Sequence, residues 1–110
     1  MIREISGFDE FMSLIRDGVV VADFYTTWCL PCKLMEPVLE EVESRFRGRV
    51  TVVRVDCEKN MDLASRFSVM SVPTVIVFSG GREVRRVVGF STRAADEIVR
   101  AVMGAVRGGR

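Results

Sequence analysis

Apolar residues near the start of the chain recur at helical spacing and then run almost without a break. Positions 8, 11, 12 and 15 form one apolar face of a helix, and Gly18 is placed to end that helix. Ser6 and Asp9 at its start resemble a capping box. The next stretch, Val19–Tyr25, is apolar except for Asp23 and is rich in β-branched and aromatic residues. It predicts a strand buried on both faces, as in a parallel sheet.

A second helical stripe and further strands follow. Positions 34, 38, 39, 42 and 46 are apolar, and Pro31 suits the first turn of the helix that they predict. Pro37 lies inside that helix and should kink it. The other expected elements are strands over 50–55, 74–78 and 83–88, a short helix over 62–67 and a candidate edge strand over 2–5.

Turn and capping residues near the C-terminus complete the order of elements. Gly80 and Gly81 predict a hairpin between the last two strands, and Ser91 or Thr92 can cap a final helix. Helices that alternate with strands predict an α/β fold with a parallel sheet, to which the hairpin adds an antiparallel pair. Right-handed crossovers place helices on both faces. The 110 residues suit one domain, 1–110, with residues 107–110 as a loose tail.

Composition and charge exclude several classes of function. Hydrophobic residues make up 48% of the chain and charged residues 28%, which is typical of a globular domain. A net charge of +1 gives no electrostatic reason to expect binding to nucleic acid or to an anionic membrane. No run reaches the roughly 18 apolar residues of a membrane span, and the N-terminus does not resemble a secretory signal. We therefore expect a soluble, cytoplasmic protein.

Three cysteines and the absence of histidine narrow the chemistry further. Without histidine there is no Cys/His catalytic pair and no His-ligated metal site. Cys29 and Cys32 form a C-x-x-C motif between the end of the Val19–Tyr25 strand and the start of a helix. A helix N-terminus stabilises an anion, so the pKa of Cys29 should be depressed. Cys32, about one helical turn away, can close a disulfide, so Cys29 is expected to attack and Cys32 to resolve.

Other interpretations of the motif stay open at this point. A zinc site needs four ligands, and only Cys57 and carboxylates could complete one, so we expect no metal. A structural or vestigial pair is a further alternative. In a reducing compartment a close cysteine pair is more often catalytic than structural, which favours a redox dithiol. Cys57 is either a free, partly buried thiol or a regulatory or dimer-forming one.

The residues around this motif resemble the thioredoxin family over essentially the whole chain. The segment 21–33, Val-Ala-Asp-Phe-Tyr-Thr-Thr-Trp-Cys-Leu-Pro-Cys-Lys, is similar to the active-site segment of thioredoxins. Pro37 matches the family's helix-kinking proline, Pro73 its cis-proline loop and Gly89 its late glycine. The resemblance implies a thioredoxin fold, with a central five-stranded mixed sheet flanked by four helices. It also implies dithiol–disulfide exchange without a cofactor.

A buried acid and its neighbour acquire roles from the resemblance. Asp23 would assist proton transfer at Cys32, and as an acid in a buried strand it should have a raised pKa. The alternative is a hydrogen-bonded core aspartate. Arg54 falls where the family usually has a lysine near that acid, and a permanent cation could hold Asp23 ionised.

A further set of residues would surround the dithiol and meet the substrate. Pro73 would be cis and would set the Val72 backbone beside Cys29, where it could pair with an extended substrate segment. Trp28 would shield the dithiol and contact partners, unless it is only packed. The remaining implied site residues are Pro31 and Lys33 in the active-site segment and Met70, Ser71 and Gly89 along an apolar groove.

Leu30 departs from the glycine that the family most often has between its cysteines. Its apolar side chain could remove water from Cys29 and raise the pKa of that thiol, which would change the balance between dithiol and disulfide. The leading hypothesis is a monomeric protein-disulfide reductase that is recycled by a flavin-dependent thioredoxin reductase. The alternatives are a protein-disulfide oxidase or isomerase, and a binding module with an incidental dithiol.

Overall fold

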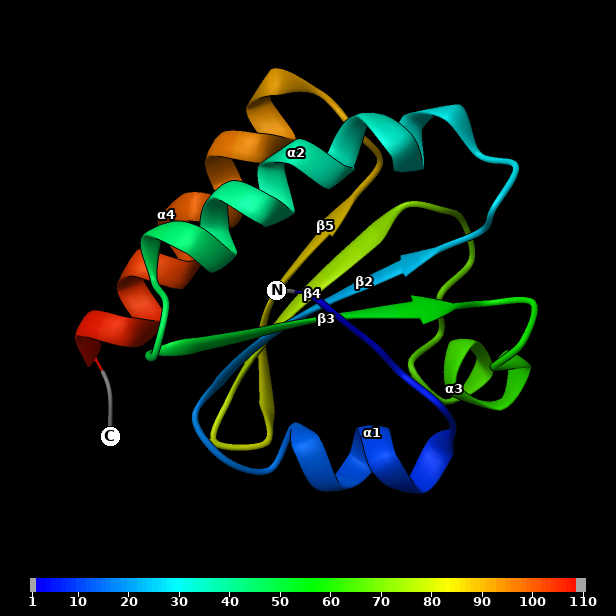
Figure 1. Cartoon of the computed structure of the whole chain (residues 1–110), viewed down its shortest axis with the longest axis horizontal. Coiled ribbons are helices and arrows are strands. Elements are labelled where there is room, and N and C mark those ends of the chain that lie inside the picture. Colours follow the sequence, from blue (N-terminus) through cyan, green and yellow to red (C-terminus); the bar gives the residue numbers. More distant parts are fainter. Residues whose placement is uncertain (1, 109–110) are drawn as a thin grey trace.

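Five strands form one mixed sheet with helices on both sides, in a computed structural model that describes residues 2–108 (Figure 1). In chain order the elements are β1 (Arg3–Glu4), α1 (Phe8–Leu14), β2 (Val19–Tyr25), α2 (Leu30–Arg45), β3 (Val50–Asp56), α3 (Met61–Arg66), β4 (Thr74–Ser79), β5 (Arg82–Val88) and α4 (Thr92–Gly108). The order of the strands across the sheet is β1-β3-β2-β4-β5. These elements confirm the predicted α/β class with its mixed five-stranded sheet.

The central strand β2 contributes to two separate cores. Val19 and Val21 pack with residues of α2 and α4. Val20 and Phe24 pack with residues of α1 and α3 on the other side of the sheet. Because successive side chains of a strand point to opposite faces, a strand covered on both faces is apolar at almost every position. The same alternation puts Asp23 on the face that α2 covers.

The direction of β4 differs from the sequence prediction. Strands that alternate with helices were expected to be parallel, and this is true of β1, β3 and β2, but β4 runs antiparallel to β2. Residues 57–73, which include α3, stay at the end of the sheet where β3 finishes (Figure 1). β4 therefore starts at that end and runs in the opposite direction to β3. β2 also finishes at this end of the sheet. The segment after β2 and the loop before β4 are therefore brought together.

The helix ends agree with the sequence prediction at one site and differ from it at two. Gly7, with a φ of +125°, is the N-cap of α1 and Ser6 gives no side-chain cap; Glu10 instead accepts a hydrogen bond from the Ser6 N–H. At α4, Ser91 Oγ accepts a backbone N–H of the first turn at 3.0 Å, as predicted. α4 continues to Gly108, so residues 107 and 108 of the expected loose tail are helical. Residues 109 and 110 lie outside the described part.

The buried face of α2 follows the predicted stripe at Leu39, Val42 and Phe46 but departs from it in the first turn. Leu34 is half-exposed, although it was expected to face the core. The buried residues of α2 are Cys32, Met35, Leu39 and Val42. The second cysteine therefore lies on the buried side of the helix. Among the described helices, none has both the length and the apolar character to cross a membrane.

Candidate active site

Cys29 and Cys32 are joined by a disulfide at the start of α2, with their Cα atoms 5.2 Å apart. Cys29 is the N-cap of that helix, and its Sγ accepts a hydrogen bond from the Cys32 backbone N–H at 3.2 Å. A sulfur in this position faces the free N–H groups and the positive end of the helix dipole. The same contacts would stabilise a thiolate on Cys29 once the disulfide is reduced.

The two cysteines differ in their access to solvent. Cys29 is 6% exposed and Cys32 is 1% exposed. Both pack with Tyr25 and Val72 in a small cluster at this edge of the sheet. Both cysteines are largely buried, and Cys29 is the more accessible residue.

The loop before β4 passes beside the disulfide. Its Val72–Pro73 peptide bond is cis, as the resemblance implied, and the Val72 carbonyl oxygen lies 3.8 Å from Cys29 Sγ. Gly89, which follows β5, donates its N–H to the Pro73 carbonyl oxygen at 2.8 Å. The structure thus joins the loop before β4 to the segment after β5, on one side of the dithiol.

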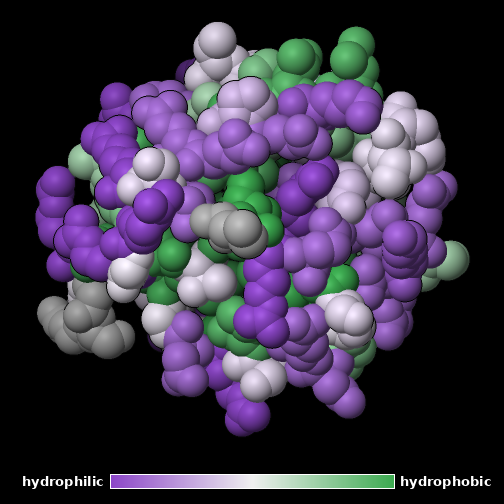
Figure 2. All heavy atoms as spheres, viewed as in Figure 1, coloured by the Kyte–Doolittle hydropathy of each residue, from purple (hydrophilic) through white to green (hydrophobic). Residues whose placement is uncertain are grey.

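Exposed side chains surround the disulfide, and several of them are apolar. Trp28 is 71% exposed and Leu30 is 66% exposed, so neither is buried by ordinary packing. Trp28 Nε1 donates a hydrogen bond to Glu58 Oε2 at 3.0 Å. The other exposed residues from the predicted site are Pro31, Lys33, Met70 and Ser71. Figure 2 shows hydrophobic side chains at the upper edge of a largely hydrophilic face, near the N-terminal end of α2.

Asp23 is fully buried on the face of β2 that α2 covers. Among the described residues, neither of its carboxylate oxygens has a hydrogen-bond partner, so the alternative of a hydrogen-bonded core aspartate is not what the structure shows. Arg54 Nε lies 3.6 Å from Asp23 Oδ2, which is an ion pair but longer than a hydrogen bond. Burial raises the pKa of Asp23 to about 7, and the charge of Arg54 acts in the opposite direction.

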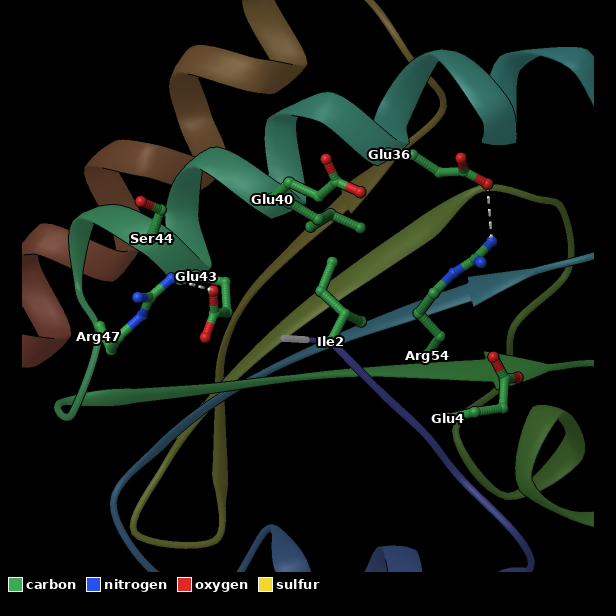
Figure 3. A pocket seen from close by; sticks show the side chains of 9 residues that line it. Ile2, Glu4, Glu36, Glu40, Glu43, Ser44, Arg47 and Arg54 are labelled. Atoms are coloured by element: carbon green, nitrogen blue, oxygen red, sulfur yellow. Dashed lines mark hydrogen bonds and ion pairs between the residues drawn. The ribbon is translucent and has the colours of Figure 1, made fainter.

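Arg54 also contacts side chains that sequence patterns did not single out. Its Nη2 lies 3.2 Å from Glu36 Oε2 (Figure 3). Its guanidinium carbon lies 3.7 Å from the centre of the Tyr25 ring. The Tyr25 hydroxyl in turn donates to Glu4 Oε2 at 2.7 Å. Helical spacing could have pointed to Glu36, because it lies four residues after Cys32 and therefore on the same side of α2.

Cys57 follows β3 and lies at the same end of the sheet as the disulfide, because β2 and β3 are parallel. Its N–H donates to the Tyr25 carbonyl oxygen at 2.9 Å, and its side chain is a half-buried free thiol. Burial raises the pKa of Cys57 to about 11, so this thiol stays protonated at neutral pH. Within residues 2–108 no cluster of three or more metal-ligating side chains could hold an ion.

Comparisons with known proteins agree with this geometry. The family model described as Thioredoxin matches residues 4–103. A thioredoxin of Staphylococcus aureus is 42% identical over 84 residues, which cover 76% of this chain and 81% of that protein. A mutant thioredoxin of Halobacterium salinarum has a TM-score of 0.85 at 31% identity, over 96% of this chain and 90% of that chain. The Malassezia sympodialis thioredoxin has a TM-score of 0.86 at 29% identity, over 96% and 93%.

These matches extend over most of the chain, and the family model spans both cysteines of the disulfide. A reversible cysteine pair at a helix N-terminus is the working part of thiol–disulfide oxidoreductases, the class that this fold and site define. Within that class, the chain belongs to the thioredoxin family.

Proposed function

We propose that the protein reduces disulfide bonds of other proteins. The thiolate of Cys29 attacks a substrate disulfide, its S–S bond breaks, and one substrate sulfur leaves as a thiolate while the other stays bonded to Cys29. Cys32 then attacks the Cys29 sulfur and releases the second substrate thiolate. Two electrons pass to the substrate, and the dithiol becomes the Cys29–Cys32 disulfide seen in this structure.

The position of Cys29 at the N-cap of α2 is the observation that carries this proposal. Its sulfur accepts a backbone N–H, and Cys29 is the more exposed residue of the two. Both features favour a stable, accessible thiolate on Cys29 and not on Cys32. They support attack by the first cysteine and resolution by the second.

Asp23 would serve the second half of the reaction. Cys32 must lose its proton to attack, and its buried position favours a nearby proton acceptor over bulk water. A carboxylate whose pKa lies near 7 can accept the proton at neutral pH, because its proton affinity is matched to the operating pH. Asp23 would return the proton to solvent or to a leaving substrate thiolate in a later step.

The surroundings of the disulfide fit an extended protein segment as substrate. The backbone of Val72 lies beside Cys29, where its N–H and C=O could pair with a substrate strand. Trp28 and Met70 offer exposed apolar surface to such a segment. The remaining residues that we assign to this substrate surface are Pro31, Lys33, Ser71, Pro73 and Gly89.

Leu30 was the reason to consider an oxidase or isomerase. Its side chain is 66% exposed, so most of it extends into solvent and little of it can remove water from Cys29. This placement favours the reductase over the reverse direction of electron flow. A reductase needs a source of electrons, for which we propose a flavin-dependent thioredoxin reductase, and we propose that the chain acts in the cytoplasm as a single-domain monomer.

Trapping of the mixed disulfide tests the proposed roles of the two cysteines. In a Cys57→Ser background, Cys32→Ser protein incubated with a disulfide-bonded peptide should accumulate an adduct on Cys29, seen as a mass increase under non-reducing conditions. The matched Cys29→Ser protein should accumulate little adduct, because Cys32 is buried and lacks the N-cap position. Equal trapping by the two variants would contradict the assignment, and trapping by Cys32 alone would reverse it.

A further inference from the structure

The surroundings of Asp23 include a carboxylate for which the reaction above has no role. Glu36 lies on α2, and Figure 3 shows its side chain and that of Arg54 pointing toward each other from α2 and β3. The Glu36 side chain is partly exposed, whereas Asp23 is not exposed at all. One cation is therefore placed between a buried carboxylate and one that reaches solvent.

Arg54 is shared unequally between the two carboxylates. Its Nη2 is 3.2 Å from Glu36 Oε2, and its Nε is 3.6 Å from Asp23 Oδ2. Among the described residues, both Asp23 oxygens and the Arg54 Nε lack a hydrogen-bond partner. The ring of Tyr25, 3.7 Å from the guanidinium carbon, holds the cation in this intermediate position. The closer contact to Glu36 leaves Asp23 with an incomplete ion pair.

We propose that Glu36 is a positioning residue that competes with Asp23 for Arg54 and thereby keeps Asp23 a strong enough base to accept the proton of Cys32. Cys32, Glu36 and Arg54 line one cavity of about 160 Å³, so the competition takes place beside the resolving thiol. This inference rests on the proposed role of Asp23. A cation close to a carboxylate lowers its pKa, and Glu36 limits that effect by drawing the cation away.

The other charged groups around Asp23 leave Arg54 as the decisive one. Glu4, on β1, is a second carboxylate and raises the pKa of Asp23 in the same direction as Glu36. Cys57, after β3, stays a neutral thiol, and β4 places the apolar Val75 directly opposite Asp23. Among the described groups that act on Asp23, Arg54 is the cation. The position of Arg54 therefore determines how strongly the charged form of Asp23 is stabilised.

A titration of Asp23 in the oxidised protein tests the competition. The carboxyl carbon of Asp23 would be followed by NMR against pH in the wild type, Glu36→Gln and Glu40→Gln. Glu40 is the matched control, because it lies one turn further along α2, lines a separate cleft together with Glu36 and Arg54 (Figure 3), and makes no hydrogen bond or ion pair with a described residue. Glu36→Gln should lower the pKa of Asp23 by about one pH unit, because Arg54 is then free to pair more closely with Asp23. A shift of this size is within the usual effect of an opposite charge a few ångströms away. Glu40→Gln should leave it in place.

A second comparison separates competition for Arg54 from the direct field of the Glu36 charge. In an Arg54→Met background, Glu36→Gln should shift the Asp23 titration by less than half as much as in the wild type. An equal shift in both backgrounds, or a Glu36→Gln variant whose Asp23 pKa is unchanged or raised, would overturn the proposal. A merely structural role of Glu36 would alter stability without moving the titration.

The titration involves no turnover, so its outcome is independent of the proposed activity. If the Asp23 shift is found but no mixed disulfide is trapped on Cys29, the reductase proposal fails and the competition for Arg54 stands. If trapping succeeds and the shift is absent, only the role of Glu36 falls.

Discussion

Asp23 carries a carboxyl group in a strand that is otherwise apolar. An isolated charge in such a place is costly, and the incomplete ion pair with Arg54 compensates only part of that cost. The result is a carboxyl group whose pKa is raised to about 7 in the folded chain, from an ordinary value of 3.8. The protein therefore gives up stability at this residue, as a group with the proposed role in proton transfer would.

Asp23→Asn should stabilise the protein in a pH-dependent way. The folded state binds the Asp23 proton more tightly than the unfolded state, so the wild type loses stability as the pH rises from about 4 to about 7 and no further above it. The variant lacks this loss. The free energy of unfolding of the variant should exceed that of the wild type only slightly near pH 4 and by a few kcal/mol near pH 8. This difference follows from about 1.4 kcal/mol for each unit by which the pKa of Asp23 is raised.

Urea unfolding of both proteins at the two pH values measures this difference. Other titrating groups are common to both chains and cancel. A gain that is equal at both pH values would show that the pKa of Asp23 is not raised by burial.

Sequence patterns predicted the candidate reactive residues but not all of their neighbours. Cys29, Cys32 and Asp23 follow from spacing and from the buried strand, and Arg54 from its position in the family. The contact of Arg54 with Glu36 could not be predicted in the same way, because it depends on the rotation of α2 relative to β3. That rotation results from packing along the whole helix and not from any local motif.

Two serines at helix starts differ in what they stabilise. Ser91 accepts a backbone N–H of α4 through its hydroxyl, whereas Ser6 gives no side-chain cap to α1. Ser91→Ala should lower the free energy of unfolding by about 1 kcal/mol, the usual cost of losing an N-cap. Ser6→Ala is the control and should change it little. Thermal or urea unfolding measures both, and a cost at Ser6 equal to that at Ser91 would contradict the assigned caps.

The elements were predictable where hydrophobic period and turn residues agree. Val19–Tyr25 was found with its exact bounds, because a strand buried on both faces is apolar almost throughout. The direction of β4 was not predicted, because the periodicity of a strand is the same whichever way the strand runs. The cap at Gly7 was also missed, because a glycine with φ of +125° serves there without the side chain that a capping motif needs.

At the scale of the whole molecule, both edge strands of the sheet expose charged side chains. β1, at one edge, has only two residues, Arg3 and Glu4, and both are exposed. β5, at the other edge, carries charged and mostly exposed side chains at Arg82, Glu83 and Arg85. Short or charged edge strands discourage pairing with another sheet. These edges support the proposal of a monomer that presents its dithiol to other proteins.

The reduction potential of the Cys29–Cys32 pair tests the central claim most directly. It would be measured in the Cys57→Ser protein, equilibrated with a glutathione or dithiothreitol redox series and read out by alkylation of free thiols. If the protein is a reductase, we expect a potential of about −270 mV, the value known for thioredoxin. A potential of about −180 mV or higher would contradict the reductase proposal and place the protein among disulfide oxidases or isomerases.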